Sequence, residues 1–495
     1  MEIFDGFLDI HILMIALSAL LPCATIVLAI LILRQTAVRA ALAGASVAVL
    51  LWALGHFSSP NFSQIGNALF DTLILQIMVA AIMLPGLFFV EYCEQIGAPA
   101  AMAETIEELN LDPVSAAIVI STGVGVLVES LTGFGVSLLV TVPLLSRRFK
   151  RHQIIGLALI GMCLMPWGAL GVAAHLGSEL ANLNIDNFSL MIWAVSGPIA
   201  VILPALCLFF VPSRSLSDVW LALCAGLFLS GGIGIASYYG GIEIAGAIGG
   251  ILVILLIALT SPRQPEFWTK LSNRKLLPYY LLIVLVLTQK FVMIFLPLPE
   301  RLLEISSGRV MFLPLASPGL SLLSAVLISF LLLKNEVKEQ TKLSISPIIV
   351  QRSWRPLVTI FLFLLGARLL VEIGATHELS GVISSSGAIT SLSAVIVLGA
   401  LSGFVTGSGV AGNALFMTSA AATGLNFDST ALFSSLQHSS AGHTAMAALP
   451  VSAILLAALP HRLPGDDQRV MRTSLSLSVL ILFMIHFTGI LLFYL

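Results

Sequence analysis

A glutamate within an apolar run is the first residue of this sequence whose type and place could do chemistry. Glu129 lies in GVGVLVESLTGFGVSLLV, residues 123–140, and the turn Gly133-Phe134-Gly135 follows it closely. A charged side chain at membrane depth costs roughly 2.5–3.5 kcal/mol on insertion scales, so such groups tend to be functional. We expect an essential role for Glu129, either carrying a proton or capping an interaction inside its own segment.

The same turn occurs a second time. In GALSGFVTGSGVAGNALF, residues 399–416, Thr406 lies 274 residues after Thr132 and glycines follow it in the same way. Glycine turns leave backbone N–H groups uncovered, and a helix that starts there points its positive end at its neighbour, which favours an anion such as a carboxylate. The alternative is that the small residues only allow close helix packing. The predicted substrate-binding residues of the two turns are Thr132, Gly133, Phe134, Gly135, Thr406, Gly407, Ser408, Gly409 and Asn413.

Three more ionisable side chains lie in apolar stretches. Arg368 could bind the anion, or it could pair with Glu372, which lies four residues on and therefore on the same helix face. His443 is, with Glu129, a candidate proton-coupling residue, although a lone membrane histidine also serves as a packed hydrogen-bonding residue. Lys290 has no obvious partner in the sequence.

The composition places these residues in a lipid bilayer. Of the 495 residues, 58% are hydrophobic and 10% are charged, and the mean hydropathy is +1.05. A soluble chain of this length could not bury so much apolar surface in its cores. The five cysteines form no CxxC pair, and we expect no metal site and no disulfide. HExxH, GxSxG and nucleotide-binding loops do not occur, so the sequence predicts neither an enzyme nor a nucleic-acid partner.

Twelve segments are long and apolar enough to be membrane helices. They are about 10–33, 37–54, 70–91, 153–176, 188–211, 217–239, 242–260, 277–299, 310–333, 355–374, 431–459 and 473–495. Two further regions, about 114–145 and 389–423, each hold one copy of the repeat and are interrupted by Gly, Ser and Thr. We expect both to be re-entrant hairpins, because non-helical backbone is tolerated at membrane depth only inside protein or beside water.

The positions of the basic residues predict an orientation. With the N-terminus outside and both hairpins re-entrant, most of the 23 Lys and Arg residues fall in inside loops. The first hairpin then opens inward and the second outward, as in inverted-repeat secondary transporters. The predicted fold is an all-α polytopic membrane protein with about 12 transmembrane helices and two re-entrant hairpins. Residues 1–260 would form the N-terminal repeat and 261–495 the C-terminal repeat, with both termini outside.

Two pairs of motifs resemble the signatures of the L-lactate permease family. The first pair is VESLTGFGVSLLVTVPLL with MPWGALGVAAHL, and the second is FVTGSGVAGNALF with LQHSSAGHTAMAALPVS. The family carries an aspartate after Thr-Gly-Ser, where this chain has Gly409, and a lysine further on, where it has Met446. Losing an acid and a base together is expected of groups that neutralise each other. Arg368 could then supply the cation from another helix.

The resemblance implies a permease of the bacterial inner membrane for lactate or a related 2-hydroxy monocarboxylate, driven by protons. Its partners would be this small organic anion and the lipid bilayer, and the proton would be the coupling ion in place of any cofactor. A different carboxylate or an organic sulfonate is the alternative substrate. A passive anion channel and a membrane-embedded enzyme are the alternative classes.

Overall fold

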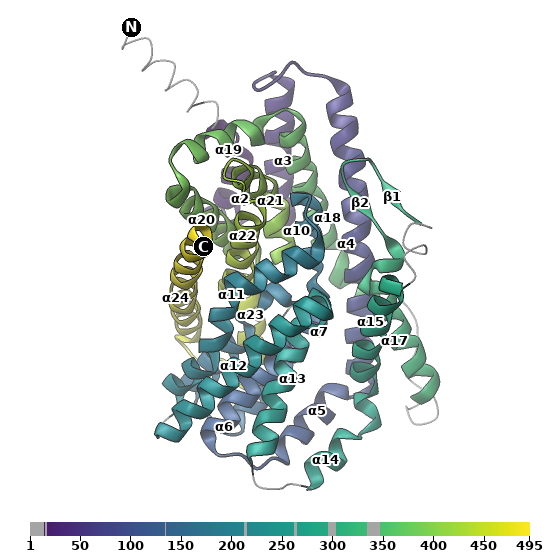
Figure 1. The fold of residues 1–495 in the computed structure, drawn as a ribbon, viewed down its shortest axis with the longest axis vertical. Coiled ribbons are helices and arrows are strands. Elements are labelled where there is room, and N and C mark those ends of the chain that lie inside the picture. The colour runs from purple at the N-terminus through teal and green to yellow at the C-terminus, as the bar shows by residue number, and fades with distance from the viewer. Residues whose placement is uncertain are drawn as a thin grey trace.

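The chain folds almost entirely into helices. The computed structural model describes residues 14, 17–133, 135–211, 215–261, 265–295, 303–333 and 347–495. Most helices run along the long axis of the molecule (Figure 1). In the described residues the strands are two short ones, β1 (Ile305–Ser306) and β2 (Met311–Phe312), which pair antiparallel.

The predicted fold class is confirmed. Nine helices of the described residues are long and apolar enough to cross a membrane, or ten if one bent pair counts as a single span. Two of the nine are arms of the predicted hairpins. Three predicted spans, near 10–33, 37–54 and 310–333, contain shorter apolar helices. The division of the chain at residue 260 stays a prediction.

One group of helices, here called the frame, packs along one side of the molecule. It consists of α2 (Leu21–Leu31), α3 (Ala37–Ala53), α4 (Phe62–Ile96), α15 (Leu277–Phe295), α17 (Pro318–Leu333) and α18 (Pro347–Glu372). Within it α4 packs against α17 and α18, and α15 packs against α17. The other long helices are α11 (Ile185–Cys207), α12 (Leu216–Tyr239), α13 (Ile242–Thr260) and α24 (Asp466–Tyr494).

The first re-entrant segment, hairpin 1, is confirmed by its return to the side it entered. Its first arm is α6 (Pro113–Ile118), the π-helix η1 (Val119–Gly125) and α7 (Val126–Thr132), and its second arm is α8 (Val136–Ser146). Arg148, just after α8, donates to the carbonyl of Leu111, just before α6, at 2.8 Å. Arg147 pairs with Glu107 at the same end.

Hairpin 2 has the same form. Its arms are α20 (Ala388–Thr406) and α21 (Gly409–Leu425). Asn426, just after α21, donates to the Ser384 hydroxyl, which lies just before α20, at 2.8 Å. The second arm therefore also ends beside the start of the first.

The two hairpins open toward opposite ends of the molecule, as α24 shows. This unbroken helix of 29 residues is about 43 Å long. Its first residue, Asp466, pairs with Arg151 beside the open end of hairpin 1. Near its last turn the ring of Phe493 lies 6.1 Å from that of Phe427, beside the open end of hairpin 2. The predicted inverted arrangement is thus present.

Each hairpin is preceded by a short helix at its open end, α5 (Ala98–Glu107) for hairpin 1 and α19 (Ala375–Ser385) for hairpin 2. These two helices lie at opposite ends of the molecule in Figure 1. The two ends are called the α5 side and the α19 side below. On the α5 side, α14 (Pro265–Leu271) packs on α5, and a hydrogen bond to Glu108 raises the pKa of Lys270.

Two predicted spans, 153–176 and 431–459, are broken, which corrects the expectation of continuous helices. The first consists of α9 (Arg151–Met162) and α10 (Val172–Ala181), and the second of α22 (Thr430–Thr444) and α23 (Leu449–Ala458). Gly168 and Ala448 have nearly the same extended backbone, with φ and ψ of −72° and 155° and of −67° and 149°. The remaining short helical turns are η2 (Met165–Trp167), η3 (Ala169–Gly171), η4 (Leu208–Phe210), η5 (Arg274–Leu276), η6 (Pro314–Ala316) and η7 (Ala445–Ala447).

Candidate functional site

The tip of hairpin 1 is closed by Glu129. Its carboxylate accepts the N–H of Gly135 at 3.2 Å and the hydroxyl of Ser137 at 2.7 Å. Both donors lie at the start of α8, where a helix leaves N–H groups without an intrahelical partner. The Glu129 side chain is buried, and these contacts favour capping over the proton-carrying alternative. An anion therefore already occupies this helix end, and it belongs to the protein.

The tip of hairpin 2 has no such acid. Ser408 caps α21 by accepting the N–H of Ala411 at 3.4 Å, and its carbonyl accepts that of Gly412 at 2.9 Å. The first two N–H groups of the helix, those of Gly409 and Val410, have no side-chain or loop acceptor in the described part of the chain. They remain available for another acceptor.

The threonines of both tips are used inside their own hairpins. Thr132 donates to the carbonyl of Val128 at 2.6 Å, and Thr406 donates to that of Ser402 at 2.7 Å. Both residues also end the first arm of their hairpin. Their hydroxyls fix the turn in this structure, while their role in substrate binding stays a prediction. Phe134 lies outside the described residues.

The start of α21 meets the start of α10. A methyl group on Gly409 would lie 3.2 Å from the Cβ atom of Ala173, the second residue of α10. Asn413, one turn along α21, donates to the carbonyl of Ala173 at 2.6 Å. Two half-helices therefore direct their positive ends to one buried place at the middle of the fold.

Asn413 has an unused acceptor there. Its side-chain NH₂ donates to Ala173 and, at 2.9 Å, to Nδ1 of His438. Its Oδ1 is buried with no partner among the described residues. A buried polar atom without a partner is costly, and this one offers an acceptor beside the free amides of α21.

The two histidines of α22 connect the broken spans. His438 donates from Nε2 to the carbonyl of Pro166 at 3.1 Å, since a carbonyl can only accept, and its Nδ1 accepts from Asn413. His443 donates from Nδ1 to the carbonyl of Cys163 at 2.5 Å, and its Nε2 lies 3.0 Å from the Ser196 hydroxyl. Both rings are fully buried and fully bonded in this conformation.

Each tip lies against a break in a span. A methyl group on Gly133 would meet Ala169 at 2.5 Å, and one on Gly407 would meet Ala448 at 3.1 Å. The breaks also touch each other, because Gly442 packs on Pro166 at distances that exclude any side chain. The structure thus gathers tips and breaks in one centre.

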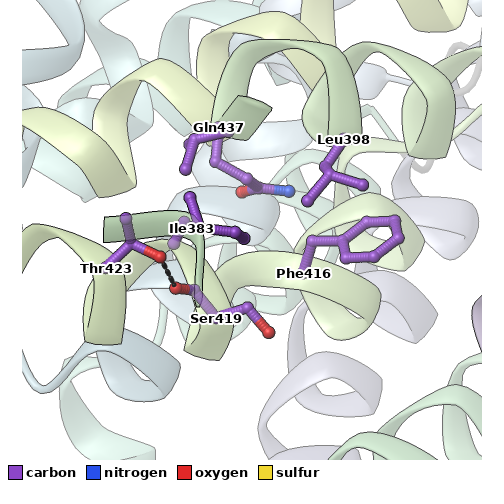
Figure 2. Close-up of a pocket in the computed structure, with 8 residues that line it drawn as sticks. Ile383, Leu398, Phe416, Ser419, Thr423 and Gln437 are labelled. Atoms are coloured by element: carbon purple, nitrogen blue, oxygen red, sulfur yellow. Dashed lines mark hydrogen bonds between the residues drawn. The ribbon is translucent and has the colours of Figure 1, made fainter. Parts of the chain in front are cut away.

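A pocket in Figure 2 lies away from this centre, inside hairpin 2. It is too narrow to hold a water molecule, so it offers no room for a substrate. Its lining residues are Ile383, Val395, Leu398, Phe416, Ser419, Ala420, Thr423 and Gln437.

Arg368 pairs neither with Glu372 nor with a tip. Its guanidinium binds the carboxylate of Asp71 on α4, and both side chains are buried. Glu372 instead pairs with Arg309 from the turn between β1 and β2, and accepts from Asn67 at 3.3 Å. The alternative in which Arg368 pairs with Glu372 is therefore wrong, because the acid that neutralises Arg368 is Asp71 on α4. Substrate binding by Arg368 stays a prediction.

Two buried acids of the predicted spans, Asp71 and Glu243, were not singled out from the sequence. The argument used for Glu129, that a charge in lipid is costly and therefore tends to be functional, applies to both of them as well. No group of three or more His, Cys, Asp or Glu residues in the described ranges could hold a metal ion.

Together, the oppositely opening hairpins and the broken spans define a polytopic, all-α membrane transporter built from inverted repeats. The family model for L-lactate permease matches residues 15–275, which is more than half of the chain. The chain belongs to the L-lactate permease family. A comparison with curated proteins finds no match. The family match covers hairpin 1 and its broken span, whereas hairpin 2 lies beyond the matched residues.

Proposed function

We propose that this protein is a secondary active transporter of lactate or a related 2-hydroxy monocarboxylate, coupled to protons. Family membership supports the class of substrate. The observation that carries the proposal is the pair of N–H groups at the start of α21, those of Gly409 and Val410, which the Ser408 cap leaves without an acceptor among the described residues. There the amides of Gly409 and Val410 could bind a carboxylate, and the unpaired Oδ1 of Asn413 could accept the hydroxyl of a 2-hydroxy acid.

This site offers both the hydrogen-bond donors and the acceptor that a 2-hydroxy acid requires. A carboxylate needs donors, which helix-end amides supply without a full positive charge. A hydroxyl needs an acceptor, and Asn413 is committed as a donor through both of its N–H groups. Simple carboxylates and organic sulfonates would use the amides alone. They are the alternative substrates.

The transporter would sit in the bacterial inner membrane with hairpin 1 opening inward. In that orientation the α5 side carries the basic residues around hairpin 1, such as Arg147 and Arg151, as inside loops do. Both termini would then lie outside.

Uptake into proteoliposomes tests this proposal. Vesicles containing the purified protein should accumulate labelled L-lactate when the outside is more acidic, and excess unlabelled lactate should compete better than propionate or methanesulfonate. Vesicles preloaded with unlabelled lactate should exchange it for external label, which a passive channel does not accelerate. Uptake that is neither saturable nor accelerated by preloading would identify a channel, and stronger competition by methanesulfonate would identify a sulfonate carrier.

A further inference from the structure

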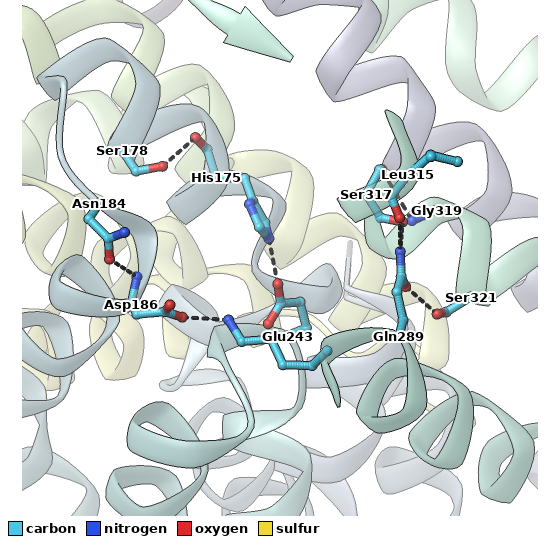
Figure 3. Close-up of polar contacts among 11 residues, drawn as sticks. His175, Ser178, Asn184, Asp186, Glu243, Gln289, Leu315, Ser317, Gly319 and Ser321 are labelled. Carbon is cyan, nitrogen blue, oxygen red and sulfur yellow. Dashed lines mark hydrogen bonds and ion pairs between the residues drawn. The ribbon is translucent and has the colours of Figure 1, made fainter. Parts of the chain in front are cut away.

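A second polar cluster is formed by side chains from α10, α11, α13 and α15 (Figure 3). His175 on α10 and Glu243 on α13 are joined by a contact of 2.9 Å between Nε2 and Oε1. Beside them Lys290 on α15 binds Asp186 on α11 at 2.5 Å. The cluster therefore holds two acids, one fixed cation and one histidine.

The acid Glu243 is not satisfied by these contacts. Its second oxygen, Oε2, is buried and has no partner among the described residues. A methyl group on Gly241 would lie 2.2 Å from this oxygen and 3.5 Å from Nζ of Lys290, so the oxygen and the ammonium lie over the same glycine. The free oxygen is a buried acceptor that no described residue fills.

The charges of the cluster favour the uptake of one proton. Counted without His175, the charges of Glu243, Asp186 and Lys290 leave one negative charge in excess. One added proton makes the group neutral, which a low-dielectric surrounding favours. A transporter that binds one monocarboxylate and one proton then has the same net charge with and without its substrates.

The other charged groups around His175 have partners of their own. Glu179, one turn along α10, accepts the N–H of Met311 at 3.0 Å. On α4, which also packs against α10, Asp71 is bound by Arg368 and lies 3.5 Å from Arg309. On α22, His438 holds the carbonyl of Pro166. The charge of Asp71 is thus balanced, whereas Glu179, bonded to a neutral N–H, adds to the excess negative charge beside His175.

Exposure decreases stepwise through the cluster. The exposed fractions of the side chains are 50% for Asp186, 25% for Lys290, 19% for His175 and 10% for Glu243. Asp186 lies in the first turn of α11, and the nearby Glu179 contacts β2, which belongs to the α19 side. A proton from that side can therefore reach Glu243 through surface groups of the cluster.

The cluster is connected both to the proposed anion site and to the frame. His175 lies two residues after Ala173, whose carbonyl binds Asn413 at the start of α21. Lys290 belongs to α15. The preceding residue, Gln289, accepts the hydroxyl of Ser321 on α17 and donates to the carbonyls of Leu315 and Ser317 just before that helix (Figure 3). A change of charge at the cluster thus acts where the two groups of helices meet.

We propose that the His175–Glu243 pair is the binding site of the coupling proton, with Lys290 and Asp186 setting how tightly it is held. This inference rests on the proposed function, since it assigns the proton that accompanies the anion. His175 and Glu243 bind the proton, while Lys290 and Asp186 are positioning residues that act through them.

The first test separates exchange from proton-driven accumulation. In proteoliposomes, His175→Gln and Glu243→Gln should keep lactate exchange between preloaded vesicles and medium within about threefold of wild type, because neither residue touches the anion. Both should lose accumulation driven by a pH gradient. The matched control is His377→Gln on the exposed face of α19, which should keep both activities. Accumulation that persists in the two variants overturns the proposal.

The second test changes Asp186 and Lys290, which are more exposed than His175 and Glu243, so it does not create a buried cavity. Asp186→Asn removes a negative charge, so the proton is held less tightly and the pH of half-maximal uptake should fall by roughly one unit. Lys290→Gln removes a positive charge, and that pH should rise by about as much. A merely structural pair would give no opposite shifts, so equal or absent shifts overturn the proposal. If the wild type itself neither takes up nor exchanges lactate, the proposed function fails instead.

Discussion

Glu129 and Gly403 occupy the same position in the two hairpins. Each backbone carbonyl accepts the N–H of the glycine four residues later, Gly133 or Gly407, at 2.8 Å. A side chain at Gly403 is impossible, because its Cβ atom would lie 1.9 Å from the carbonyl oxygen of Ala441. Hairpin 1 thus carries an internal anion, and hairpin 2 leaves the equivalent helix start open. This asymmetry between otherwise matching halves is the basis of the first predictions.

Replacing the internal anion should weaken the fold without moving the pH dependence. Glu129→Gln removes a charge-assisted cap from buried donors, which costs about 1–3 kcal/mol. We expect a lower melting temperature and slower lactate uptake, with the pH of half-maximal uptake unchanged. Ser137→Ala, which removes one donor, should show a smaller loss of stability. A shifted pH profile in Glu129→Gln would make Glu129 the proton carrier.

Filling the start of α21 should weaken substrate binding. Gly409→Ala places a methyl group 3.2 Å from the Cβ atom of Ala173, and overpacking of this kind costs roughly 1–3 kcal/mol. We expect the half-saturation concentration for lactate to rise about tenfold at normal protein levels. Gly231→Ala is the matched control, because nothing lies within 4 Å of its added methyl. An unchanged half-saturation concentration would remove this helix start from the substrate site.

Asn413 should distinguish acids with a 2-hydroxyl group from those without one. Asn413→Ala removes the acceptor proposed for the hydroxyl, and a lost hydrogen bond of about 1.5 kcal/mol is about tenfold in affinity. Competition assays should show lactate losing its advantage over propionate by that factor. Asn426→Ala, at the open end of hairpin 2, should keep the preference. If propionate and lactate weaken equally, Asn413 supports the fold and does not contact the hydroxyl.

Arg368 and Asp71 should behave as a structural pair. Breaking a buried ion pair from one side costs about 3–5 kcal/mol, whereas replacing both partners with apolar residues is nearly neutral. Arg368→Gln should therefore lower the melting temperature strongly, and Arg368→Met with Asp71→Leu should restore it. The double variant should bind lactate as the wild type does. Arg472→Gln, an exposed arginine on α24, controls for loss of charge alone. A double variant that folds but needs far more lactate would show that Arg368 contacts substrate.

The opposed hairpins predict where a label enters. Of the five cysteines Cys224 is the exposed one, so Cys224→Ser gives a background that reacts little. In intact cells a membrane-impermeant maleimide should label Asp428→Cys, at the open end of hairpin 2, and spare Lys150→Cys, at that of hairpin 1. Permeabilised cells should label both. The reverse pattern would invert the orientation, and labelling of both in intact cells would contradict the opposed openings.

Local patterns were enough to predict the hairpins, because the glycine turns and the residues that close them lie within a few positions of each other. The breaks near Gly168 and Ala448 were missed, since both lie in segments apolar enough for a straight helix. Their cause is tertiary. A methyl group on Gly168 would lie 3.7 Å from the carbonyl oxygen of Glu129 in hairpin 1, and Ala448 packs on Gly407 in hairpin 2.

The polar partners were the least predictable part. Arg368 and Asp71 are 297 residues apart, and Lys290 and Asp186 are 104 apart. Helix periodicity relates residues three or four positions apart, so it favoured Glu372 as the partner of Arg368 and gave Lys290 none. His175 lies near the end of the predicted span 153–176, and no local feature connects it with Glu243.

The polar groups of the two hairpin tips find their partners at different distances along the chain, which affects the order in which the hairpins can fold during synthesis. All the partners of Glu129 lie within eight residues of it, so hairpin 1 can close while the rest of the chain is still being made. Hairpin 2 emerges later, and Asn413, His438 and His443 all bond to carbonyls of residues 163–173. The first half of the chain thus acts as a template in the bilayer for the second, and a ribosome stalled before residue 400 should hold a hairpin 1 that is already protected from proteases.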